Sequence, residues 1–506
     1  MLRNEIKNIL KKAVGEDAKV EYPITLSHGD YATNVAMKLK KNPEDIISKI
    51  SSNKIFEKVE ANKGFINFFV GKEYLQNQIK EILKQGDKYG ELDIGKREKV
   101  QVEFISANPT GPLTLGNGRG GFCGDVVASV LTKAGYKVER EYYVNDRGEQ
   151  VRKLGHSIIG DDEAVYKGEY IDELRKKITG KNVEAVGEAG AEYILENMIK
   201  PTVSKMGIKY DVWFRENSLY QKKEVEEIIE WLKRKKLAYE KDNALWFKSS
   251  NYGDEKDRVL IKEDKETTYL ASDIAYLKNK KDRGFKKILY FWGADHHGYI
   301  DRLQAAGEAL GFEKGAIEII IMQLVKLFKD GKEQRMSKRE GVYVTLDELI
   351  DEVGIDATRF FFLARTNNTH LNFDMNLAKE QSNKNPVYYV QYAHARISSI
   401  LRSAKGIKLS TINDKLLVHP SELALVKQLI KLPEVIEDTA KDYQTQRLTK
   451  YSQDIATAFH KFYADCRVID EKQPELTQAR LSLASATQVV LKNILSTMGI
   501  SAPEKM

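Results

Sequence analysis

A turn rich in Gly and Pro is the first segment of this sequence that could do chemistry. It spans 108–112 and follows an expected strand over 99–105, where polar and apolar residues alternate. The glycines within 116–121 then lead into a helical pattern. Backbone N–H groups at such a helix N-terminus can bind a phosphate. Because the segment matches neither GxGxxG nor GxxxxGK[ST], the turn alone leaves nucleotide binding and a tight structural turn both open.

A basic segment at 334–341, with the sequence QRMSKREG, is the second candidate. It follows an expected β region and precedes an expected helix. Lys338 could meet a nucleotide phosphate there as a mobile point charge. An ordinary exposed basic loop is the alternative.

The third candidate is the segment 292–299, with the sequence WGADHHGY, at the end of an expected strand. Ligands of open α/β sheets bind at the carboxyl ends of strands. Adjacent histidines beside Asp295 suggest a metal site, but such neighbours rarely chelate one ion and no third ligand is evident. We therefore expect hydrogen bonding to a substrate or nucleotide and assign no metal.

The fourth candidate is Asp273, which lies among apolar residues where a helix is expected to begin. A structural N-cap is one interpretation of such an aspartate. The other is a carboxylate that binds a cation, ideally a guanidinium, in bidentate form.

The elements around these segments predict a parallel sheet. The strand at 99–105, the Gly-rich turn, the helix after it and a second strand at 137–144 form a βαβ unit. Residues 151–255 are mostly helical in pattern and strongly charged, so we interpret them as an insertion that splits one α/β domain. Further strands are expected at 258–261, 287–292 and 317–322.

The two ends of the chain have different patterns. The opening residues repeat apolar side chains at helical spacing, and a strand is expected at 64–70, so the first block is a small α+β domain. From about residue 380 the pattern is helical to the end, with few prolines. We therefore expect domains at 1–90, 91–375 and 376–506.

The composition is that of a folded globular protein of several domains. The chain has 506 residues, of which 42% are hydrophobic and 31% charged. These values exclude collagen-like, disordered and mucin-like proteins. The net charge of +7, from 81 basic and 74 acidic residues, permits a nucleic acid partner but does not argue for one.

The two cysteines, Cys123 and Cys466, lie far apart in the sequence and cannot form a disulfide framework or a cysteine zinc site. Residues 1–7 lack the apolar core of a signal peptide, and no apolar run reaches the length of about 18 residues that a membrane span needs. We expect a soluble cytoplasmic protein without a membrane partner.

Taken together and in order, these segments resemble a bacterial-type arginyl-tRNA synthetase, a class I aminoacyl-tRNA synthetase. The stretch 108–117 is similar to the HIGH region of that family, 335–339 to its KMSKS loop and 292–299 to its WGADHHGY segment. The stretch 385–396, NPVYYVQYAHAR, resembles the start of its anticodon-binding domain. The opening block and the last residues add to the likeness, through 29–32, 64–68 and 498–506.

The resemblance implies a fold and a reaction. The fold is α/β, with a Rossmann-like parallel-sheet catalytic domain, an inserted helical region, an N-terminal α+β domain and a C-terminal all-α anticodon-binding bundle. The reaction joins ATP and L-arginine to arginyl-adenylate and then transfers the arginyl group to tRNA(Arg). Because no protein nucleophile is needed, catalysis would depend on positioning and charge stabilisation. Mg²⁺ would accompany ATP, and we expect a monomer.

The resemblance also assigns roles to individual residues. Catalytic roles are assigned to Thr114, Asn117 and Lys338. ATP contacts are assigned to Pro112, Leu113, Gly116, Gly118, His296, Met336, Ser337 and Lys338. Arginine contacts are assigned to Asn108, Gln150, Tyr269, Asp273 and His296. Contacts to tRNA are assigned to Tyr31, Asn34, Tyr389, Tyr392 and Met506, with the two tyrosines at 389 and 392 stacking on anticodon bases.

Thr114 and Asn117 depart from the family, which usually has histidine at both positions. The change at Thr114 is the larger one, because a threonine hydroxyl reaches less far than an imidazole and carries no charge. His296, His297, Arg119 or closer backbone contacts at the neighbouring glycines could compensate. Two functions therefore remain open: an active arginine–tRNA ligase, and a catalytically weakened paralogue that binds tRNA or arginine. A third, a nucleotidyltransferase without tRNA, is opposed by the helical C-terminal domain.

Overall fold

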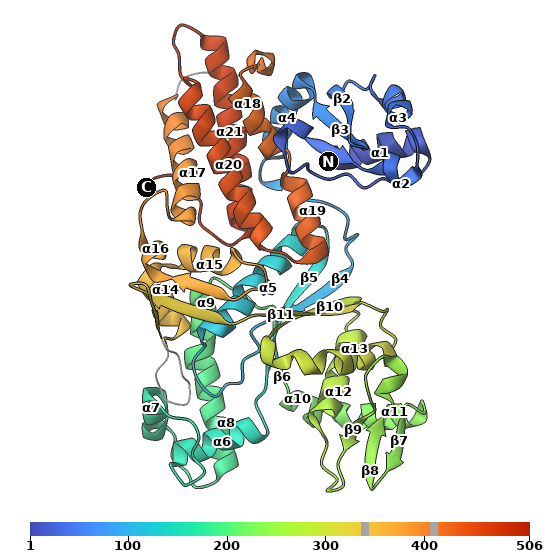
Figure 1. Cartoon of the computed structure of the whole chain (residues 1–506). Coiled ribbons are helices and arrows are strands. Elements are labelled where there is room, and N and C mark those ends of the chain that lie inside the picture. Colours follow the sequence, from blue (N-terminus) through green and yellow to red (C-terminus); the bar gives the residue numbers. More distant parts are fainter. Residues whose placement is uncertain (335–343, 405–412) are drawn as a thin grey trace. The chain divides into compact units, whose positions relative to one another are not determined.

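The computed structural model describes residues 1–334, 344–404 and 413–506, which form two compact units (Figure 1). The terminal unit consists of Met1–Leu92, Gln381–Asp442 and Arg447–Met506. The central unit consists of Asp93–Glu380 and Tyr443–Gln446. The two ends of the chain thus fold into the same unit.

The central unit is built on a parallel sheet of the order β11-β10-β4-β5-β6. Its strands are β4 (Lys99–Glu103), β5 (Lys137–Val144), β6 (Val212–Arg215), β10 (Lys287–Gly293) and β11 (Ile317–Met322). The chain moves outward from β4 through β5 to β6, and then returns to the other side of β4 for β10 and β11. The strand order therefore reverses between β4 and β10, and their carboxyl ends border the crevice where ligands of such sheets bind.

Helices cover both faces of this sheet. On one face α5 (Leu115–Lys133) packs closely, because a Cβ at its Gly124 would lie 2.5 Å from Phe104. On the other face lie α12 (Tyr269–Asp282) and α13 (Ile300–Ala309), whose apolar side chains share a core with Ile288 and Ile317. Since strand side chains alternate, Val102 and Phe104 turn toward α5 while Glu103 turns toward α12.

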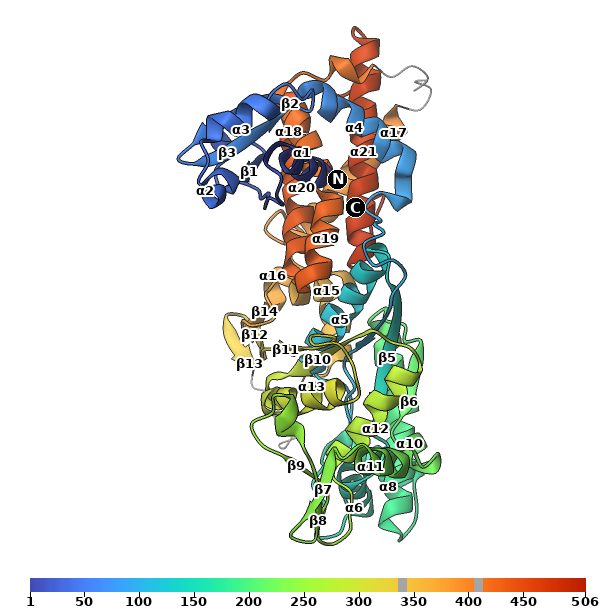
Figure 2. The same cartoon turned by 90° about the vertical axis from the view of Figure 1, so that its right-hand side faces the viewer.

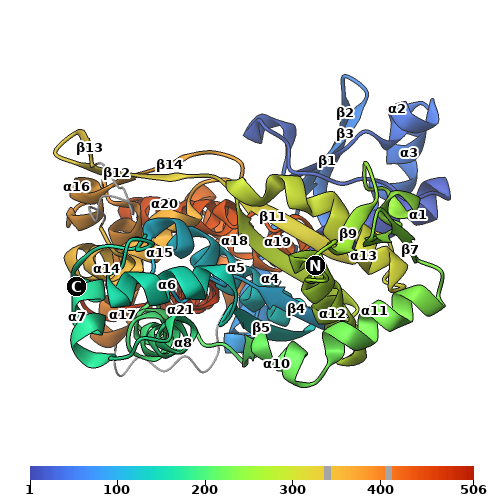
Figure 3. The ribbon, with the colours of Figure 1, turned by 90° about the horizontal axis from the view of Figure 1, so that it is seen from below.

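The region 151–255, expected to be helical, also contains strands. Its helices are α6 (Glu149–Ile159), α7 (Glu169–Lys177), α8 (Val183–Ile194), α9 (Lys200–Lys205), α10 (Asn217–Gln221) and α11 (Glu224–Arg234), and α6 and α8 lie side by side (Figure 3). However, β6 is an outer strand of the parallel sheet, and β7 (Ala238–Lys241) and β8 (Ala244–Phe247) form a hairpin.

The strand expected at 258–261 is present as β9 (Arg258–Ile261), but it pairs with β8 and not with the parallel sheet. The strands β6, β7, β8 and β9 have four residues each, and such short strands do not show a periodic pattern in the sequence. Their partners in the fold, and not their own sequences, decide which sheet they join.

A small sheet and three helices complete the central unit. The sheet has the order β13-β12-β14, from β12 (Val325–Lys329), β13 (Lys332–Gln334) and β14 (Leu371–Asp374). The helices are α14 (Leu346–Val353), α15 (Ile355–Leu363) and α16 (Met375–Lys379). At the start of α14 the Glu348 N–H donates to Thr345 Oγ1 (3.2 Å) and the Thr345 N–H donates to the Glu348 carboxylate (2.6 Å), a reciprocal cap that fixes where the helix begins.

The terminal unit joins a small α+β module to a helical bundle (Figure 2). The module has an antiparallel sheet, β1-β3-β2, from β1 (Tyr31–Thr33), β2 (Phe56–Asn62) and β3 (Phe65–Val70). Lys63 and Gly64 join β2 to β3 with φ of 50° and 84°, the two positive values that a tight hairpin turn needs. The helices of the module are α1 (Leu2–Val14), α2 (Val35–Leu39), α3 (Pro43–Ile50) and α4 (Lys72–Gln85).

The bundle confirms the helical pattern expected near the C-terminus. Its helices are α17 (Pro386–Ser403), α18 (Pro420–Leu429), α19 (Leu432–Asp442), α20 (Gln446–Asp465) and α21 (Pro474–Thr497). Four of them have proline in the first turn, where its missing N–H breaks no hydrogen bond. Within the described parts of the chain, we find no helix long and apolar enough to cross a bilayer.

Candidate active site

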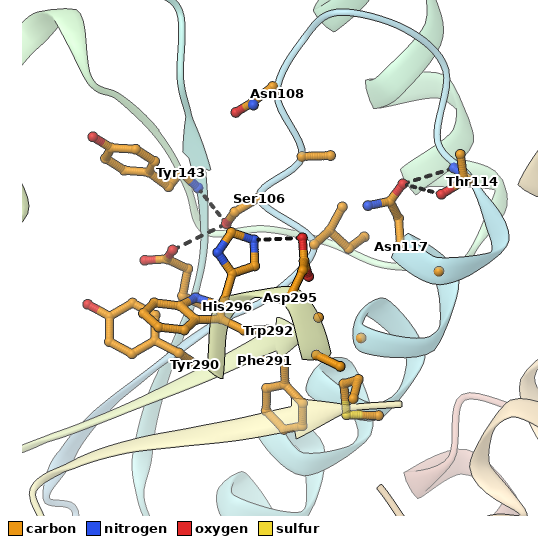
Figure 4. Close-up of a pocket in the computed structure, with 18 of the residues that line it drawn as sticks. Ser106, Asn108, Thr114, Asn117, Tyr143, Tyr290, Phe291, Trp292, Asp295 and His296 are labelled. Atoms are coloured by element: carbon orange, nitrogen blue, oxygen red, sulfur yellow. Dashed lines mark hydrogen bonds and ion pairs between the residues drawn. The ribbon is translucent and has the colours of Figure 1, made fainter. Parts of the chain in front are cut away.

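A cavity of about 730 Å³ opens at the carboxyl ends of β4 and β10 (Figure 4). Its walls come from the loop after β4, the first turn of α5, the first two turns of α12 and the segment that follows β10. The volume lies within the range that small-molecule sites occupy. The cavity is therefore at the crevice that the reversal of strand order predicts.

Thr114 and Asn117 are hydrogen bonded to each other at the start of α5. The side-chain oxygen of Asn117 accepts from the Thr114 N–H and from its hydroxyl, each at 2.9 Å. The amide nitrogen of Asn117 then points away from Thr114 toward the cavity (Figure 4). Thr114 thus orients a hydrogen-bond donor at a helix N-terminus, where negative charge is favoured.

Gly116 lies between them and leaves space in the cavity wall. A Cβ at this position would have only the Thr114 hydroxyl oxygen nearby, at 3.8 Å. Packing within the protein therefore does not require glycine at 116. The missing side chain instead leaves the first turn of α5 open to a ligand.

Asp273 supplies negative charge to the opposite wall. Tyr269, Asp273 and Tyr276 lie on one face of α12 at helical spacing and all line the cavity. The hydroxyl of Tyr299 donates to Asp273 Oδ2 at 2.5 Å. Burial raises the pKa of the Asp273 carboxyl to about 6, although the hydrogen bond from Tyr299 acts in the opposite direction. At neutral pH this carboxyl is mostly ionised.

The loop after β4 is held in a strained conformation. Ile105 and Ser106 have φ of 64° and 40°, and a β-branched residue rarely adopts such a value. The Ser106 hydroxyl accepts from the Tyr143 N–H (3.1 Å) and donates to Glu103 Oε1 (3.3 Å). These bonds, drawn in Figure 4, fix the loop that presents Asn108 to the cavity.

Glu216 is a second carboxyl near Asp273, and its position at the site was not evident from the sequence. It is buried, and its backbone N–H donates to the Val144 carbonyl at 3.0 Å. Burial, and then the negative charge of Asp273, raise the pKa of Glu216 to about 7. The signal that could have found it is its position at the carboxyl end of β6, a strand that was not predicted.

The segment after β10 forms the exposed edge of the cavity. It is a short 3₁₀ helix, Ala294–Tyr299, and it brings His296 but not His297 into the cavity lining. His296 Nε2 lies 3.6 Å from Asp295 Oδ2, and its ring lies 5.8 Å from that of Trp292 (Figure 4). Both histidines are exposed, so hydrogen bonding to a ligand is open to His296.

The cavity brings together seven of the residues that the sequence assigned to catalysis, ATP or arginine. They are Asn108, Thr114, Gly116, Asn117, Tyr269, Asp273 and His296. Met336, Ser337 and Lys338 lie outside the described residues. Val344, directly after that gap, lines the cavity.

Four other assigned residues do not line the cavity, and their contacts explain why. Leu113 is buried, and a Cβ at Gly118 would lie 2.8 Å from the side chain of Leu346, so both positions serve packing. Pro112 is half-buried outside the lining. Gln150 Oε1 instead accepts a hydrogen bond from the Tyr166 hydroxyl at 2.5 Å.

Arg119 cannot compensate for the change at Thr114. Its side chain is fully buried and donates to the backbone carbonyls of Gln323 and Thr366, each at 2.8 Å. The guanidinium is therefore committed to holding loops of the central unit together. Of the side chains that the sequence offered as compensation, His296 lines the cavity, and the structure adds the contact between Thr114 and Asn117, which the sequence did not suggest.

The assigned tRNA residues of the bundle form an aromatic surface on α17 and α20. The Tyr392 ring is 37% exposed and stacks with the rings of Tyr388 (6.3 Å, 8° between planes) and His460 (5.9 Å, 26°). Tyr389 contacts His460 at 4.9 Å between ring centres. Such an exposed stack suits unpaired RNA bases. Met506, also assigned to tRNA, is 54% exposed.

In the α+β module the two assigned residues differ. Asn34 is exposed at the start of α2. Tyr31 is buried, with 2% of its surface exposed, and its hydroxyl donates to the Glu434 carboxylate at 3.2 Å. A side chain so enclosed cannot offer its ring to tRNA, and Tyr31 instead holds the module against α19.

Comparison with protein families gives matches along nearly the whole chain. Residues 1–70 match the arginyl-tRNA synthetase N-terminal domain, and residues 78–399 match the catalytic domain of class I tRNA synthetases (R). Residues 390–506 match the DALR anticodon-binding domain.

Individual relatives agree with these matches. The arginine–tRNA ligase of Bacillus subtilis (strain 168) is 44% identical, over 100% of this chain and 98% of the relative. That of Carboxydothermus hydrogenoformans is also 44% identical, over 96% and 94%. In fold, the arginyl-tRNA synthetase of Thermus thermophilus superposes over 100% of both chains with a TM-score of 0.82 at 20% identity. The chain is therefore a member of the arginyl-tRNA synthetase family.

Proposed function

We propose that the cavity beside β4 and β10 binds ATP and L-arginine together, and that this chain is an active arginine–tRNA ligase. The observation that carries the proposal is Asp273. Among the described residues no lysine, arginine or histidine forms an ion pair with it, although it lies in the cavity wall. A half-buried carboxylate without a cation is suited to a cationic ligand.

L-Arginine is the ligand that fits this wall. Its planar guanidinium can take a bidentate contact from Asp273, with the charge of Glu216 nearby. Tyr269, at 60% exposure, lies at the rim of the cavity and can cover the bound side chain. Asn108 is placed to hydrogen bond the amino acid backbone. A lysine side chain has no planar guanidinium group and could not make this bidentate contact with Asp273.

ATP would bind on the α5 side of the cavity. Gly116 leaves space there, and the Asn117 amide and the N-terminus of α5 favour negative charge. His296 could meet the nucleotide from the opposite edge. Lys338 lies outside the described residues and is proposed from its sequence alone.

Mg²⁺ would accompany the ATP phosphates. We find no cluster of three or more His, Cys, Asp and Glu among the described residues that could hold an ion by itself. Mg²⁺ is commonly held by substrate phosphates with one or two protein carboxylates. Asp295, exposed at the cavity edge, is the carboxylate that could share it.

The reaction needs positioning more than protein chemistry. The carboxylate of arginine attacks the α-phosphorus of ATP, a carboxyl oxygen–phosphorus bond forms, and pyrophosphate leaves. A hydroxyl of the tRNA 3′-terminal adenosine then attacks the arginyl carbonyl, and AMP leaves. The chain would hold the two substrates in line and donate hydrogen bonds to developing negative charge, which are the terms expected to lower such barriers.

For tRNA(Arg), we propose that the aromatic surface of Tyr388, Tyr389, Tyr392 and His460, together with Met506, contacts the anticodon loop. Asn34 is the remaining candidate for a contact from the α+β module. A monomer in the cytoplasm remains the expectation from the sequence.

ATP–pyrophosphate exchange, measured with tRNA(Arg) present, tests this proposal. The expected result is exchange that depends on arginine and is not supported by lysine. Binding of arginine without exchange would instead favour the weakened paralogue. The contact between Thr114 and Asn117 argues against that second candidate, since it keeps an oriented donor at the HIGH-like turn.

A further inference from the structure

Lys280 is a charged side chain buried beneath the floor of the cavity. It is completely buried on α12, two turns after Asp273. Its Nζ donates to Glu103 Oε2 (2.6 Å) and to the Tyr290 hydroxyl (2.9 Å). It also lies over the rings of Tyr276 (4.0 Å) and Tyr290 (4.2 Å). A buried ammonium is costly unless it is fully paired, and this one is enclosed by partners.

Three of these partners line the cavity, whereas Lys280 does not. They are Glu103, Tyr276 and Tyr290. Glu103 has both oxygens engaged by the protein: Oε2 accepts from Lys280 and from the Tyr276 hydroxyl (2.9 Å), and Oε1 accepts from Ser106 (3.3 Å). Lys280 therefore acts on the floor of the cavity through other side chains.

A second buried pair continues the network away from the cavity. Glu141 of β5 is fully buried and contacts the Tyr276 hydroxyl and Arg283. Arg283 also pairs with Glu139. Glu103 and Glu141, the buried carboxylates of the sheet face beneath α12, thus each pair with a cation, whereas Asp273 and its neighbour Glu216 form no ion pair among the described residues.

We propose that Lys280 is a positioning residue of the arginine site, which neutralises Glu103 and so leaves recognition of the guanidinium to Asp273, with Glu216 beside it. This inference rests on the proposed function, in which Asp273 pairs with arginine. Without Lys280 the cavity floor would present an uncompensated Glu103, which would compete with Asp273 for a cationic ligand. Lys280 thereby contributes to both the orientation of arginine and the charge of Asp273.

The effect of Lys280 on Asp273 can be measured through the pKa of the Asp273 carboxyl, which depends on the charged groups around it. The positive charges of Lys280 on its own helix and of Arg302 on α13 lower the pKa of Asp273, whereas Glu103 on β4 raises it. The remaining titratable groups near Asp273 are Tyr299, Glu216, Tyr143 and Tyr290. Removing Lys280 deletes a lowering influence and leaves Glu103 unopposed, so the pKa of Asp273 should rise.

The test is the pH dependence of kcat/KM for arginine in ATP–pyrophosphate exchange with tRNA(Arg), using the full chain. In Lys280→Met, the acid limb of the profile should move up by about one pH unit, the size of a single nearby charge. At pH 7 that alone lowers kcat/KM roughly twofold, because about half of Asp273 is then protonated. KM for ATP should not change. Lys278→Met, on the same helix but pairing with Asp282 at the surface, is the matched control and should keep the wild-type profile.

A double variant separates positioning from simple structural support. Glu103→Gln combined with Lys280→Met removes both charges, so its acid limb should return toward the wild-type position even if Lys280→Met folds poorly. A profile that is unmoved in Lys280→Met, with only a lower Tm, would overturn the proposal. So would a double variant whose acid limb stays as far shifted as that of the single variant.

Asp273→Asn, measured in parallel, keeps the two proposals distinct. If arginine KM is unchanged in Asp273→Asn, the proposed function of that residue has failed. If Asp273→Asn impairs arginine use but Lys280→Met leaves the profile in place, only the role of Lys280 has failed.

Discussion

Replacing Asp273 by asparagine removes the negative charge of the proposed arginine wall while keeping its shape. Asparagine retains an oxygen that can accept the hydrogen bond that Tyr299 now donates at 2.5 Å. What is lost is the charge that faces the guanidinium. Losing one partner of a desolvated, hydrogen-bonded charge pair costs about 2–5 kcal/mol, or about 30- to 5000-fold in kcat/KM for arginine.

The loss should be specific to arginine. Asp273 lies on α12, whereas the proposed ATP contacts lie on the first turn of α5. KM for ATP should therefore stay within about twofold of wild type, because a substitution away from the ATP contacts should change the binding free energy by only a few tenths of a kcal/mol. ATP–pyrophosphate exchange, with arginine and ATP varied separately, measures both quantities.

The pH profile provides an internal check on the same residue. Because burial raises the pKa of Asp273 to about 6, the wild-type kcat/KM for arginine should fall about tenfold per pH unit below that value, as the carboxyl is protonated and loses its charge. The asparagine variant should lack this acid limb. Its Tm at neutral pH should equal or exceed that of wild type, because a carboxyl whose pKa is raised in the folded state destabilises the fold once it is ionised.

Two results would refute this reasoning. One is an equal loss of arginine and ATP use in Asp273→Asn in a protein with an unchanged Tm, since the residue would then support the whole site and not one ligand. The other is a variant that keeps the wild-type acid limb, since a different group would then be titrating.

Three further predictions concern the HIGH-like turn and the anticodon surface. Gly116→Ala should fold normally but slow adenylate formation at least about tenfold, because blocking space for the ligand costs roughly 1.4 kcal/mol. Gly124→Ala is the packing control: its Cβ would meet an aromatic ring at 2.5 Å, so the free energy of unfolding should fall by about 1–3 kcal/mol. Normal exchange in Gly116→Ala would contradict the placement of ATP. Thr114→Val removes the hydroxyl that orients Asn117, so the rate of single-turnover adenylation should fall about fivefold, which corresponds to the loss of about 1 kcal/mol of hydrogen bonding. KM for arginine should not change. An unaltered rate would show that the hydrogen bond from the Thr114 backbone N–H is enough to orient Asn117. Tyr392→Ala should raise KM for tRNA(Arg) by about 5- to 150-fold, because about 1–3 kcal/mol of base stacking is lost. Binding of arginine and ATP, measured by calorimetry without tRNA, should stay the same. Weakened binding of these small substrates would place the defect in the fold.

Much of the fold follows from patterns in the sequence. The βαβ unit at 99–144 was predictable because alternation, a glycine-rich turn and a helical repeat occur there in succession. The C-terminal bundle was predictable because its helices are long and amphipathic. In contrast, β6 and β9 have four residues each, and only their partners place one in the parallel sheet and the other outside it.

The site was predictable in its outline but not in its supporting contacts. Asn108, Thr114, Asp273 and His296 follow strands or begin helices, so the rule for ligands of parallel sheets brings them to one edge. Gln150 and Tyr31 could not be excluded from the sequence, because only the fold shows that their side chains are engaged by Tyr166 and Glu434.

The buried support of the site was also beyond the sequence. Lys280 is one of three lysines in the last half of α12, where a surface role is the usual expectation for the side chain. Glu216 follows a strand that the sequence did not reveal. Their importance depends on which side chains from distant segments meet them in three dimensions.

Aminoacylation of tRNA(Arg) decides whether this chain is an active arginine–tRNA ligase. The purified full chain is incubated with ATP, Mg²⁺, arginine and tRNA(Arg), and the arginyl-tRNA formed is counted, with lysine in place of arginine as the control. We expect arginyl-tRNA at a turnover of the order of 1–10 s⁻¹, as is typical of enzymes, and no product with lysine. A folded protein that binds tRNA(Arg) and arginine but forms no arginyl-tRNA would contradict it.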